Sequence, residues 1–386
     1  MATTTALKGL DRVKDVYRNR DKRAKELKSQ GKKIVGYYCC YPILEMMTAL
    51  DLVPYRILGD PNEPIVQSDR CLPTIVCPFV RSTLDLGMKG KYDFLDGFAS
   101  CHSCDSFDLC HEIWPQYVKI PFFTNLWVPH NDHAPSIEFF LACLKKFQDS
   151  LEKYVGRQIT PRQMAGAIKL HNEHRSLMRG IYALRKEEPP LISGSELQEV
   201  IIAAMSLPVQ EGNELLKEVR SDVTKRANRI ESRPRVLLWG VEIDDSSFVK
   251  ILEDAGANIV MDDTCIGSRH YWSDVELTSD PMLGIAKRYL VDILCPRTFR
   301  EHAGTYQGDL EHRFRYIKEY CREYKAAGVI LATMRYCDCH AYDAPLVSDY
   351  LKESGIPVLY LEHDYFLAGS APIKNRVQAF VEMIAQ

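Results

Sequence analysis

The chain has 386 residues, of which 46% are hydrophobic and 26% charged, and its formal net charge is −3. This length is sufficient for two or three domains with a sizeable buried core. Because there is no basic excess to hold a phosphate backbone, the composition excludes an electrostatically driven nucleic-acid partner.

The N-terminal segment and the hydropathy pattern predict a cytoplasmic protein. Residues 1–33 alternate Lys and Arg with Asp and Glu around no apolar stretch, which indicates an amphipathic surface helix and not a signal peptide. The uncharged runs Ile120–Trp127 and Ala326–Met334 are far shorter than the ~20 residues of a membrane-spanning helix. We therefore expect no membrane partner, and cysteines kept as thiols or metal ligands in a reducing cytosol.

An N-terminal helical arm (residues 1–32) precedes a first α/β domain (residues 33–135). Apolar runs predict strands at Lys33–Tyr38, Val53–Leu58, Leu95–Ser100 and Ile120–Trp127. Helices are expected at Pro42–Leu50, from Cys77-Pro78 onward, where proline is favourable at the first helical position, and at Cys104–Tyr117. This alternation predicts a doubly wound, mostly parallel sheet.

A helical region (residues 136–232) separates this domain from a second α/β domain (residues 233–386). Leu141, Leu144, Phe147 and Leu151 recur with the helical period. In the second domain the expected strands are Arg235–Val241, Asn258–Met261, Gly328–Met334 and Val358–Glu362. The expected helices are Asp245–Ala255, Pro281–Leu294, Tyr306–Ala326, Ala344–Lys352 and Ile373–Ile384. The overall prediction is an α/β fold with two Rossmann-like sheets and a functional site in the cleft between them.

Thirteen cysteines are distributed unevenly along this framework. Five crowd into one stretch, as Cys71, Cys77, Cys101, Cys104 and Cys110. The pair Cys337 and Cys339 lies far downstream, and Cys39 and Cys40 are adjacent near the start. The sequence Asp96-Gly97 leads through a strand to Cys104-Asp105, as Gly328 does to Cys337-Asp338, which hints at a duplicated ancestor.

The position of several cysteines just after predicted strands predicts that their thiols meet. Cys39, Cys104 and Cys337 each follow a predicted strand, as do their neighbours Cys40, Cys101 and Cys339. Ligands in open α/β sheets bind beyond the carboxyl ends of the strands. Cys77 begins a helix, where the partial positive charge favours a thiolate. Two facing sheets would therefore gather these sulfurs around a metal centre, most simply an iron–sulfur cluster.

Other interpretations fit fewer of the cysteines. The simplest explanation for the isolated cysteines is burial as small apolar side chains. This explanation applies to Cys143, Cys265, Cys295 and Cys321. A structural zinc site usually takes two closely spaced pairs, and only Cys101–Cys104 has a fitting gap, since Cys337 and Cys339 are one residue too close. A thioredoxin-like pair at Cys101–Cys104 would leave the remote cysteines unexplained.

The remaining motifs are sparse. Neither a dinucleotide-binding glycine motif nor a Walker A sequence occurs, so we expect no nucleotide bound by this chain. His102, His111, His340 and His363 lie near the predicted strand ends. They are interpreted equally well as hydrogen-bonded loop residues and as proton donors.

Four stretches give the chain a resemblance to the family of 2-hydroxyacyl-CoA dehydratases and ATP-dependent (class I) benzoyl-CoA reductases. They are Gly36–Glu45 (GYYCCYPILE), Cys77–Ser82 (CPFVRS), Asp262–Arg269 (DDTCIGSR) and Gly355–Asp364 (GIPVLYLEHD). With Cys104-Asp-Ser and Tyr336-Cys-Asp they span most of the chain. The cysteine-rich stretch Asp69–Pro78 is most similar to that of the smaller cluster-bearing (gamma, or C) subunits of benzoyl-CoA reductase.

The resemblance implies that Cys77, Cys104 and Cys337 are ligands of a [4Fe–4S] cluster. It implies an oxidoreductase subunit, active only in complex, that passes low-potential electrons to an aromatic acyl-CoA ring and converts it to a cyclic dienoyl-CoA. The implied partners are a related cluster-bearing subunit, ATPase activator subunits with their own cluster, and ferredoxin as the upstream donor. A dehydratase subunit and a non-catalytic electron-relay subunit are the alternatives.

The chain departs from the simplest family pattern in its extra thiols. Cys39, Cys71 and Cys339 are the leading candidates for holding a second cubane or a larger, double-cubane cluster. The proton donor has no assignment from sequence, because Arg81, His102 and Asp105 are near the expected site but fit capping or supporting roles equally well.

Overall fold

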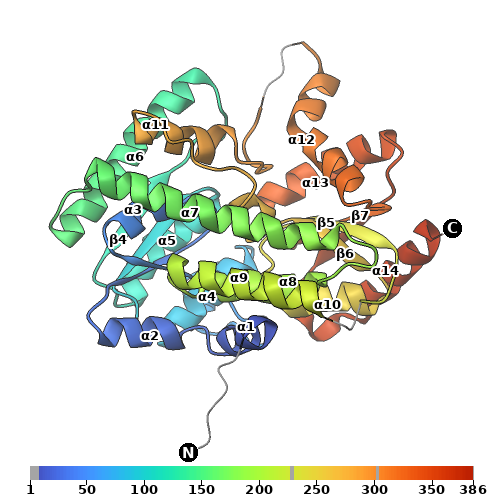
Figure 1. Cartoon of the computed structure of the whole chain (residues 1–386), viewed down its shortest axis with the longest axis horizontal. Coiled ribbons are helices and arrows are strands. Elements are labelled where there is room, and N and C mark those ends of the chain that lie inside the picture. Colours follow the sequence, from blue (N-terminus) through green and yellow to red (C-terminus); the bar gives the residue numbers. More distant parts are fainter. Residues whose placement is uncertain (1–7, 227–229, 301–303, 386) are drawn as a thin grey trace, which may run out of the picture.

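The computed structural model describes residues 8–226, 230–300 and 304–385, and it contains two four-stranded sheets, each entirely parallel and flanked by helices. The α/β prediction with two doubly wound sheets is confirmed. Figure 1 shows the first sheet in the blue and cyan half of the molecule and the second in the yellow to red half, with the long helix α7 running across both.

The first sheet has the order β2-β1-β3-β4. Its strands are β1 (Ile34–Tyr37), β2 (Val53–Arg56), β3 (Gly97–His102) and β4 (Phe123–Trp127). Helices α3 (Leu44–Ala49), α4 (Pro78–Met88) and α5 (Asp105–Tyr117) connect them. Since β1 and the first five residues of β3 are buried, both are near-continuous apolar runs, as expected of parallel strands covered on both faces.

The second sheet repeats this topology, with the order β6-β5-β7-β8. Its strands are β5 (Arg235–Gly240), β6 (Asn258–Asp263), β7 (Gly328–Met334) and β8 (Val358–His363). Its helices are α10 (Ser246–Asp254), α11 (Pro281–Ala286), α12 (Tyr306–Glu323), α13 (Asp338–Glu353) and α14 (Ala371–Ile384). Strand β3 therefore corresponds to β7, in agreement with the weak internal repeat in the sequence.

Helices of the middle region join the two sheets. They are α6 (Ala134–Val155), α7 (Pro161–Tyr182), α8 (Gly194–Met205) and α9 (Val209–Lys225). The N-terminal arm, predicted as one helix, forms two: α1 (Gly9–Arg18), which packs on α8 and α9, and α2 (Lys22–Ser29). Among the described residues, no helix has both the length and the apolar composition needed to cross a membrane.

Two helices of the second domain differ from expectation. Helix α13 begins at Asp338 and not at Ala344, and Pro345 lies inside it. Helix α11 ends at Ala286, and the residues that follow form a π-helical turn (Lys287–Val291). The first difference matters for the site, because it makes Cys337 the residue that caps α13.

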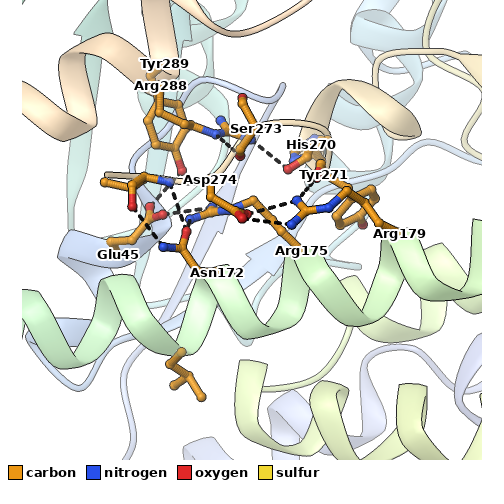
Figure 2. A network of polar contacts seen from close by, with 12 residues as sticks. Glu45, Asn172, Arg175, Arg179, His270, Tyr271, Ser273, Asp274, Arg288 and Tyr289 are labelled. Carbon is orange, nitrogen blue, oxygen red and sulfur yellow. Dashed lines mark hydrogen bonds and ion pairs between the residues drawn. The ribbon is translucent and has the colours of Figure 1, made fainter. Parts of the chain in front are cut away.

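A polar network with a buried centre fastens the middle region to both domains (Figure 2). Arg175 on α7 donates to Glu45 of α3 at 2.9 Å, and the other carboxylate oxygen of Glu45 accepts from Tyr289 Oη at 2.7 Å. Arg179, one turn further along α7, pairs with Asp274 at 2.8 Å. Because Glu45 belongs to the first domain and Tyr289 to the second, this network fixes the relative position of the sheets.

Candidate functional site

The strand order of each sheet creates a switch point, where successive connections run in opposite directions. In the first sheet this point lies between β1 and β3, and in the second between β5 and β7. Loops diverge there beyond the carboxyl ends of the strands and leave a crevice for a ligand. Cys39 follows β1, Cys104 follows β3 and Cys337 follows β7, so three of the predicted site residues lie at these crevices.

Cys77, Cys104 and Cys337 share one local position: each is the N-cap residue of a helix. Cys77 precedes α4, Cys104 precedes α5 and Cys337 precedes α13. Helix N-termini carry unpaired backbone N–H groups and partial positive charge, which stabilise an anionic sulfur. Three such termini, two from the first domain and one from the second, are therefore suited to hold thiolates.

These three cysteines line a single cavity of about 230 Å³ between the two sheets. Cys39 and Cys339 line it as well, so the structure brings together five of the six predicted ligand positions. Phe79, Val80, Phe107, Val241 and Met334 form its apolar wall. Whether the cysteines bind a cluster stays a prediction, but their meeting at one cavity is a property of the fold.

Burial keeps the capping thiols protonated in the absence of a metal. It raises the pKa of Cys77 to about 11, against the lowering effect of the Val80 and Phe79 backbone N–H groups. A hydrogen bond with Cys339, and then burial, raises the pKa of Cys104 well above its usual value. Burial likewise raises the pKa of Cys337. Metal binding at these thiols would therefore release protons.

Cys39 is held in a strained backbone conformation, with a φ of 60°, which is uncommon for a residue other than glycine. The guanidinium of Arg56 donates to its carbonyl oxygen. Arg56 is in turn paired with Glu242 at 2.6 Å, and both side chains are buried. Glu242 follows β5 and lines the same cavity. A charged pair between the two domains thus fixes the turn that carries Cys39.

Cys265 and Cys295, which the sequence assigned to packing, also line the cavity, although Cys295 is at the same time part of the hydrophobic core, as predicted. A hydrogen bond with Cys40 lowers the pKa of Cys295 to about 6, although burial opposes this change. Cys143 and Cys321 are core residues of α6 and α12, as predicted. Seven cysteines therefore face one space, including two that are isolated in sequence.

A chain of buried contacts reaches the sulfur of Cys337. Asp263 accepts from Arg269 at 2.7 Å, and Arg269 Nη1 lies 2.8 Å from His340 Nε2. Because arginine only donates, His340 Nε2 must accept, which leaves the proton of the neutral ring on Nδ1. That atom lies 3.5 Å from Cys337 Sγ. The arrangement supplies an N–H donor to the sulfur.

Three other predicted residues take separate places. Cys71, the sixth predicted ligand position, lies outside the cavity lining, and its thiol donates to the carbonyl oxygen of Ser68 at 3.4 Å. Cys101 lies inside β3, because that strand extends two residues beyond its predicted end, and its thiol is 3.4 Å from Ser103 Oγ. Cys110 is buried in the core beside Tyr38, 3.8 Å from its hydroxyl.

The candidate proton donors also separate. Asp105 lines the cavity. Arg81 instead pairs with Asp69 and donates to the Thr74 carbonyl. The ring of His102 packs on Trp127, with 4.5 Å between the centroids. Of these three residues, only Asp105 is placed where it could contact a ligand.

The donor set and the charge around the cavity fit a cluster with thiolate ligands. In the described parts of the chain, no three or more His, Cys, Asp or Glu side chains are placed so that they could hold a metal ion, so the fit rests on the donor types, the cavity volume and the charge. A cavity of about 230 Å³ is much larger than the ~10–15 Å³ that one water needs. Arg56, Arg269 and Arg297 are buried around the thiols, where their positive charge would balance an anionic centre.

Sequence reasoning missed several cavity residues. Glu242 lies two residues beyond the end of β5, so the strand-end rule, applied to residues other than cysteine, would have found it. Arg297 and His130 come from loops that meet in space: Arg297 donates to the Val128 and Pro129 carbonyls at 3.0 and 2.9 Å. No local pattern in the sequence marks that encounter.

Comparisons with known proteins identify the family of the chain. Residues 39–384 match the family described as 2-hydroxyglutaryl-CoA dehydratase, D-component. The chain is 26% identical over 358 residues to a benzoyl-CoA reductase subunit of Thauera aromatica, covering 92% of this chain and 91% of that one. It is 27% identical over 377 residues to the (R)-phenyllactyl-CoA dehydratase beta subunit of Clostridium sporogenes, covering 96% and 97%. The beta subunit of (R)-2-hydroxyglutaryl-CoA dehydratase from Acidaminococcus fermentans is 23% identical over 366 residues, covering 92% and 94%.

Proposed function

The chain belongs to the 2-hydroxyglutaryl-CoA dehydratase D-component family, and from this premise we propose that it is an iron–sulfur subunit that delivers low-potential electrons to an acyl-CoA. The observation that carries the proposal is the meeting of three N-cap cysteines, Cys77, Cys104 and Cys337, at one buried cavity between two sheets. Relatives named as reductase and dehydratase subunits support it.

Cys77, Cys104 and Cys337 would hold a [4Fe–4S] cluster, which supplies one-electron chemistry when it is bound. The helix N-termini favour the thiolate form of these ligands. His340 donates an N–H group to the Cys337 sulfur, and hydrogen bonds of this kind tune the reduction potential. Phe79, Phe107 and other apolar side chains form one wall of the site beside these thiols.

The additional thiols support a larger metal content. Cys39, Cys339, Cys265 and Cys295 line the same cavity as the three capping cysteines. We propose that some of them hold a second cubane or one larger, double-cubane cluster. Cys71 is left out of this set, because its side chain lies outside the lining.

For the reaction we propose reduction of an aromatic acyl-CoA, as in the relative named as a benzoyl-CoA reductase subunit. The first electron destroys the aromatic stabilisation of the ring, so a donor of very low potential is needed, and the thioester helps by accepting the added charge. The proposed partners are a related cluster-bearing subunit and ATPase activator subunits, which would receive their electrons from ferredoxin. A dehydratase reaction is the second candidate, because the phenyllactyl-CoA dehydratase beta subunit is equally similar.

Electron consumption by the reconstituted complex separates these candidates. The chain, produced without oxygen and combined with its partner subunit and activator, would be given benzoyl-CoA in one assay and a 2-hydroxyacyl-CoA in another. A reductase consumes two reducing equivalents per molecule of product, whereas a dehydratase recycles its electron and consumes far less than one. Absence of iron from the anaerobically purified chain would contradict both candidates.

A further inference from the structure

Three cavities adjoin one another along the loop that follows β5. An open groove of about 290 Å³ is lined by Asp244 together with Arg20 and Tyr55. A small cavity of about 20 Å³ shares Asp244 with this groove. The same small cavity shares Glu242 and Met334 with the cysteine cavity. Asp244 therefore lies between the open groove and the small cavity, and Glu242 lies between the small cavity and the cysteine cavity.

The small cavity has the size and the polar groups needed to hold one water molecule. Its 20 Å³ exceeds the ~10–15 Å³ that a water needs. Two of its lining residues carry buried polar atoms without a hydrogen-bond partner among the described residues, Glu242 Oε2 and His363 Nε2. Unpartnered buried polar atoms are costly, and a water between them would satisfy both.

Hydrogen bonding fixes the proton position on His363. Its Nδ1 lies 3.0 Å from the backbone carbonyl of Asp364, so Nδ1 donates. Burial lowers the pKa of this imidazole, which keeps the ring neutral and makes Nε2 an acceptor. Phe248 stacks on the ring, with 4.4 Å between centroids, and both residues line the small cavity.

The two carboxyl groups are suited to exchanging protons near neutral pH. One oxygen of Glu242 accepts from Arg56 at 2.6 Å, and the other has no partner among the described residues. Burial raises the pKa of Glu242 to about 7, although Arg56 opposes it. Burial also raises the pKa of Asp244 to about 6, against hydrogen bonds from Tyr365 Oη and the Gly59 backbone N–H. Further charged or titratable groups influence Glu242 electrostatically or line the small cavity and the cysteine cavity. They are Tyr37, Cys39, Cys77, Cys104, Asp105, His130, Asp245, Cys265, Cys295, Arg297, Cys337, Asp338, Cys339, His340, Tyr342, His363 and Tyr365.

We propose that Asp244, a water in the small cavity and Glu242 form a proton path from the open groove to the cysteine cavity, with Glu242 as the group that protonates the substrate there. This proposal rests on the proposed function, because the proton acceptor is an acyl-CoA that has received electrons in that cavity. The Glu242 O–H bond breaks, and its proton goes to the negatively charged substrate.

The carboxylate of Glu242 is then reprotonated from the water, which takes a proton from Asp244, and Asp244 takes one from solvent in the groove. No residue of the path changes oxidation state. His363 accepts a hydrogen bond from the water and orients it, so it is a positioning residue. Met334 lines both the small cavity and the cysteine cavity and gives the path an apolar wall where they meet.

The test uses E242Q and D244N in the reconstituted complex. Glutamine keeps an acceptor for Arg56 but cannot release a proton, so turnover of E242Q should fall by about 10²–10⁴-fold, with iron content and the spectrum of the reduced protein unchanged. Turnover of D244N should fall less than turnover of E242Q, and it should show a larger solvent isotope effect than turnover of the wild type. E253Q is the matched control, because burial also raises the pKa of Glu253, which lines none of the three cavities. It should turn over like the wild type.

Infrared titration of the isolated chain separates this proposal from the proposed function. The wild type should show a buried carboxyl band that titrates near pH 7 and disappears in E242Q. Wild-type turnover of E242Q, or an unchanged infrared titration, overturns the path. If the wild type binds iron but converts no acyl-CoA, the proposed function fails, and the infrared result alone decides whether Glu242 exchanges protons with the groove.

Discussion

Cys104 and Cys337 are equivalent residues of the two sheets: each caps the helix that follows the third strand of its own domain. The duplicated topology therefore points two helix N-termini at one cavity, and Cys77 at the start of α4 adds a third. Every element that presents these sulfurs is also a source of partial positive charge. Ligand placement and electrostatic stabilisation of the thiolates thus come from the same feature of the fold.

Each single replacement by serine, of Cys77, Cys104 or Cys337, should remove most of the bound iron. Loss of one of three ligands leaves an incomplete ligand set, and serine is a poor ligand for iron–sulfur clusters. Iron and acid-labile sulfide are measured on anaerobically purified protein. C321A serves as the control, because Cys321 is buried in the core of α12 and lines no part of the cavity. Wild-type iron content in all three variants would disprove the assignment.

Variants of Cys295 and Cys71 test which of the extra thiols bind metal in a larger cluster. Cys295 faces the cavity, whereas Cys71 lies outside its lining. If the extra thiols bind metal, the wild type should contain clearly more than four irons per chain. C295A should then lose part of this iron, and C71A should retain all of it. About four irons in the wild type, unchanged in C295A, would restrict the site to one cubane.

The sequence was sufficient to predict what depends on local pattern. The strands were found because buried parallel strands are near-continuous apolar runs, and Cys39, Cys104 and Cys337 were found because they follow those runs. The start of α13 was placed six residues too late, at Ala344, although the helix begins at Asp338 and continues through Pro345.

Residues that meet only through the packing of distant loops could not be predicted. Cys265 and Cys295 are isolated in sequence and look like ordinary small core residues, yet both reach the cavity. Their exposure to that space depends on how the second domain sits against the first. The position of Glu242 was predictable in principle, since it lies two residues beyond the end of β5, but it is not a cysteine and no motif marks it.

The Arg175–Glu45 pair should make a large contribution to stability. Both side chains are buried, so R175M leaves the Glu45 carboxylate without its ion-pair partner inside the protein. Breaking a buried pair in this way costs about 3–5 kcal/mol, which urea unfolding would measure. R315M is the matched control, because the Arg315–Glu319 pair is exposed and should contribute less than about 1 kcal/mol. Equal effects in both variants would show that the network in Figure 2 does not fasten the domains.

The same pair predicts a loss of stability in acid. Burial alone would raise the pKa of Glu45, but Arg175, followed by His171 and Arg288, lowers it from 4.5 to about 2. A depressed pKa contributes stability that is present above the unfolded-state value and is lost as the pH falls toward the folded-state value. Between about pH 4.5 and 2 this group should account for about 3 kcal/mol of lost stability. E45Q should show a flatter pH dependence of unfolding across that range, and an unchanged slope would contradict the assignment.

His340 should set the reduction potential of the bound centre through its contact with Cys337. Arg269 fixes the tautomer that directs Nδ1–H toward the sulfur, and burial, then Arg269, holds the pKa of His340 well below its usual value. A hydrogen bond to a charged acceptor is worth about 1.5–3 kcal/mol, so H340L should lower a one-electron potential by about 65–130 mV. A redox titration followed by electron paramagnetic resonance measures this change. H111L is the control, because His111 on α5 lines no part of the cavity and should leave the potential unchanged. An unaltered potential in H340L would mean that the contact with Cys337 does not stabilise the reduced state.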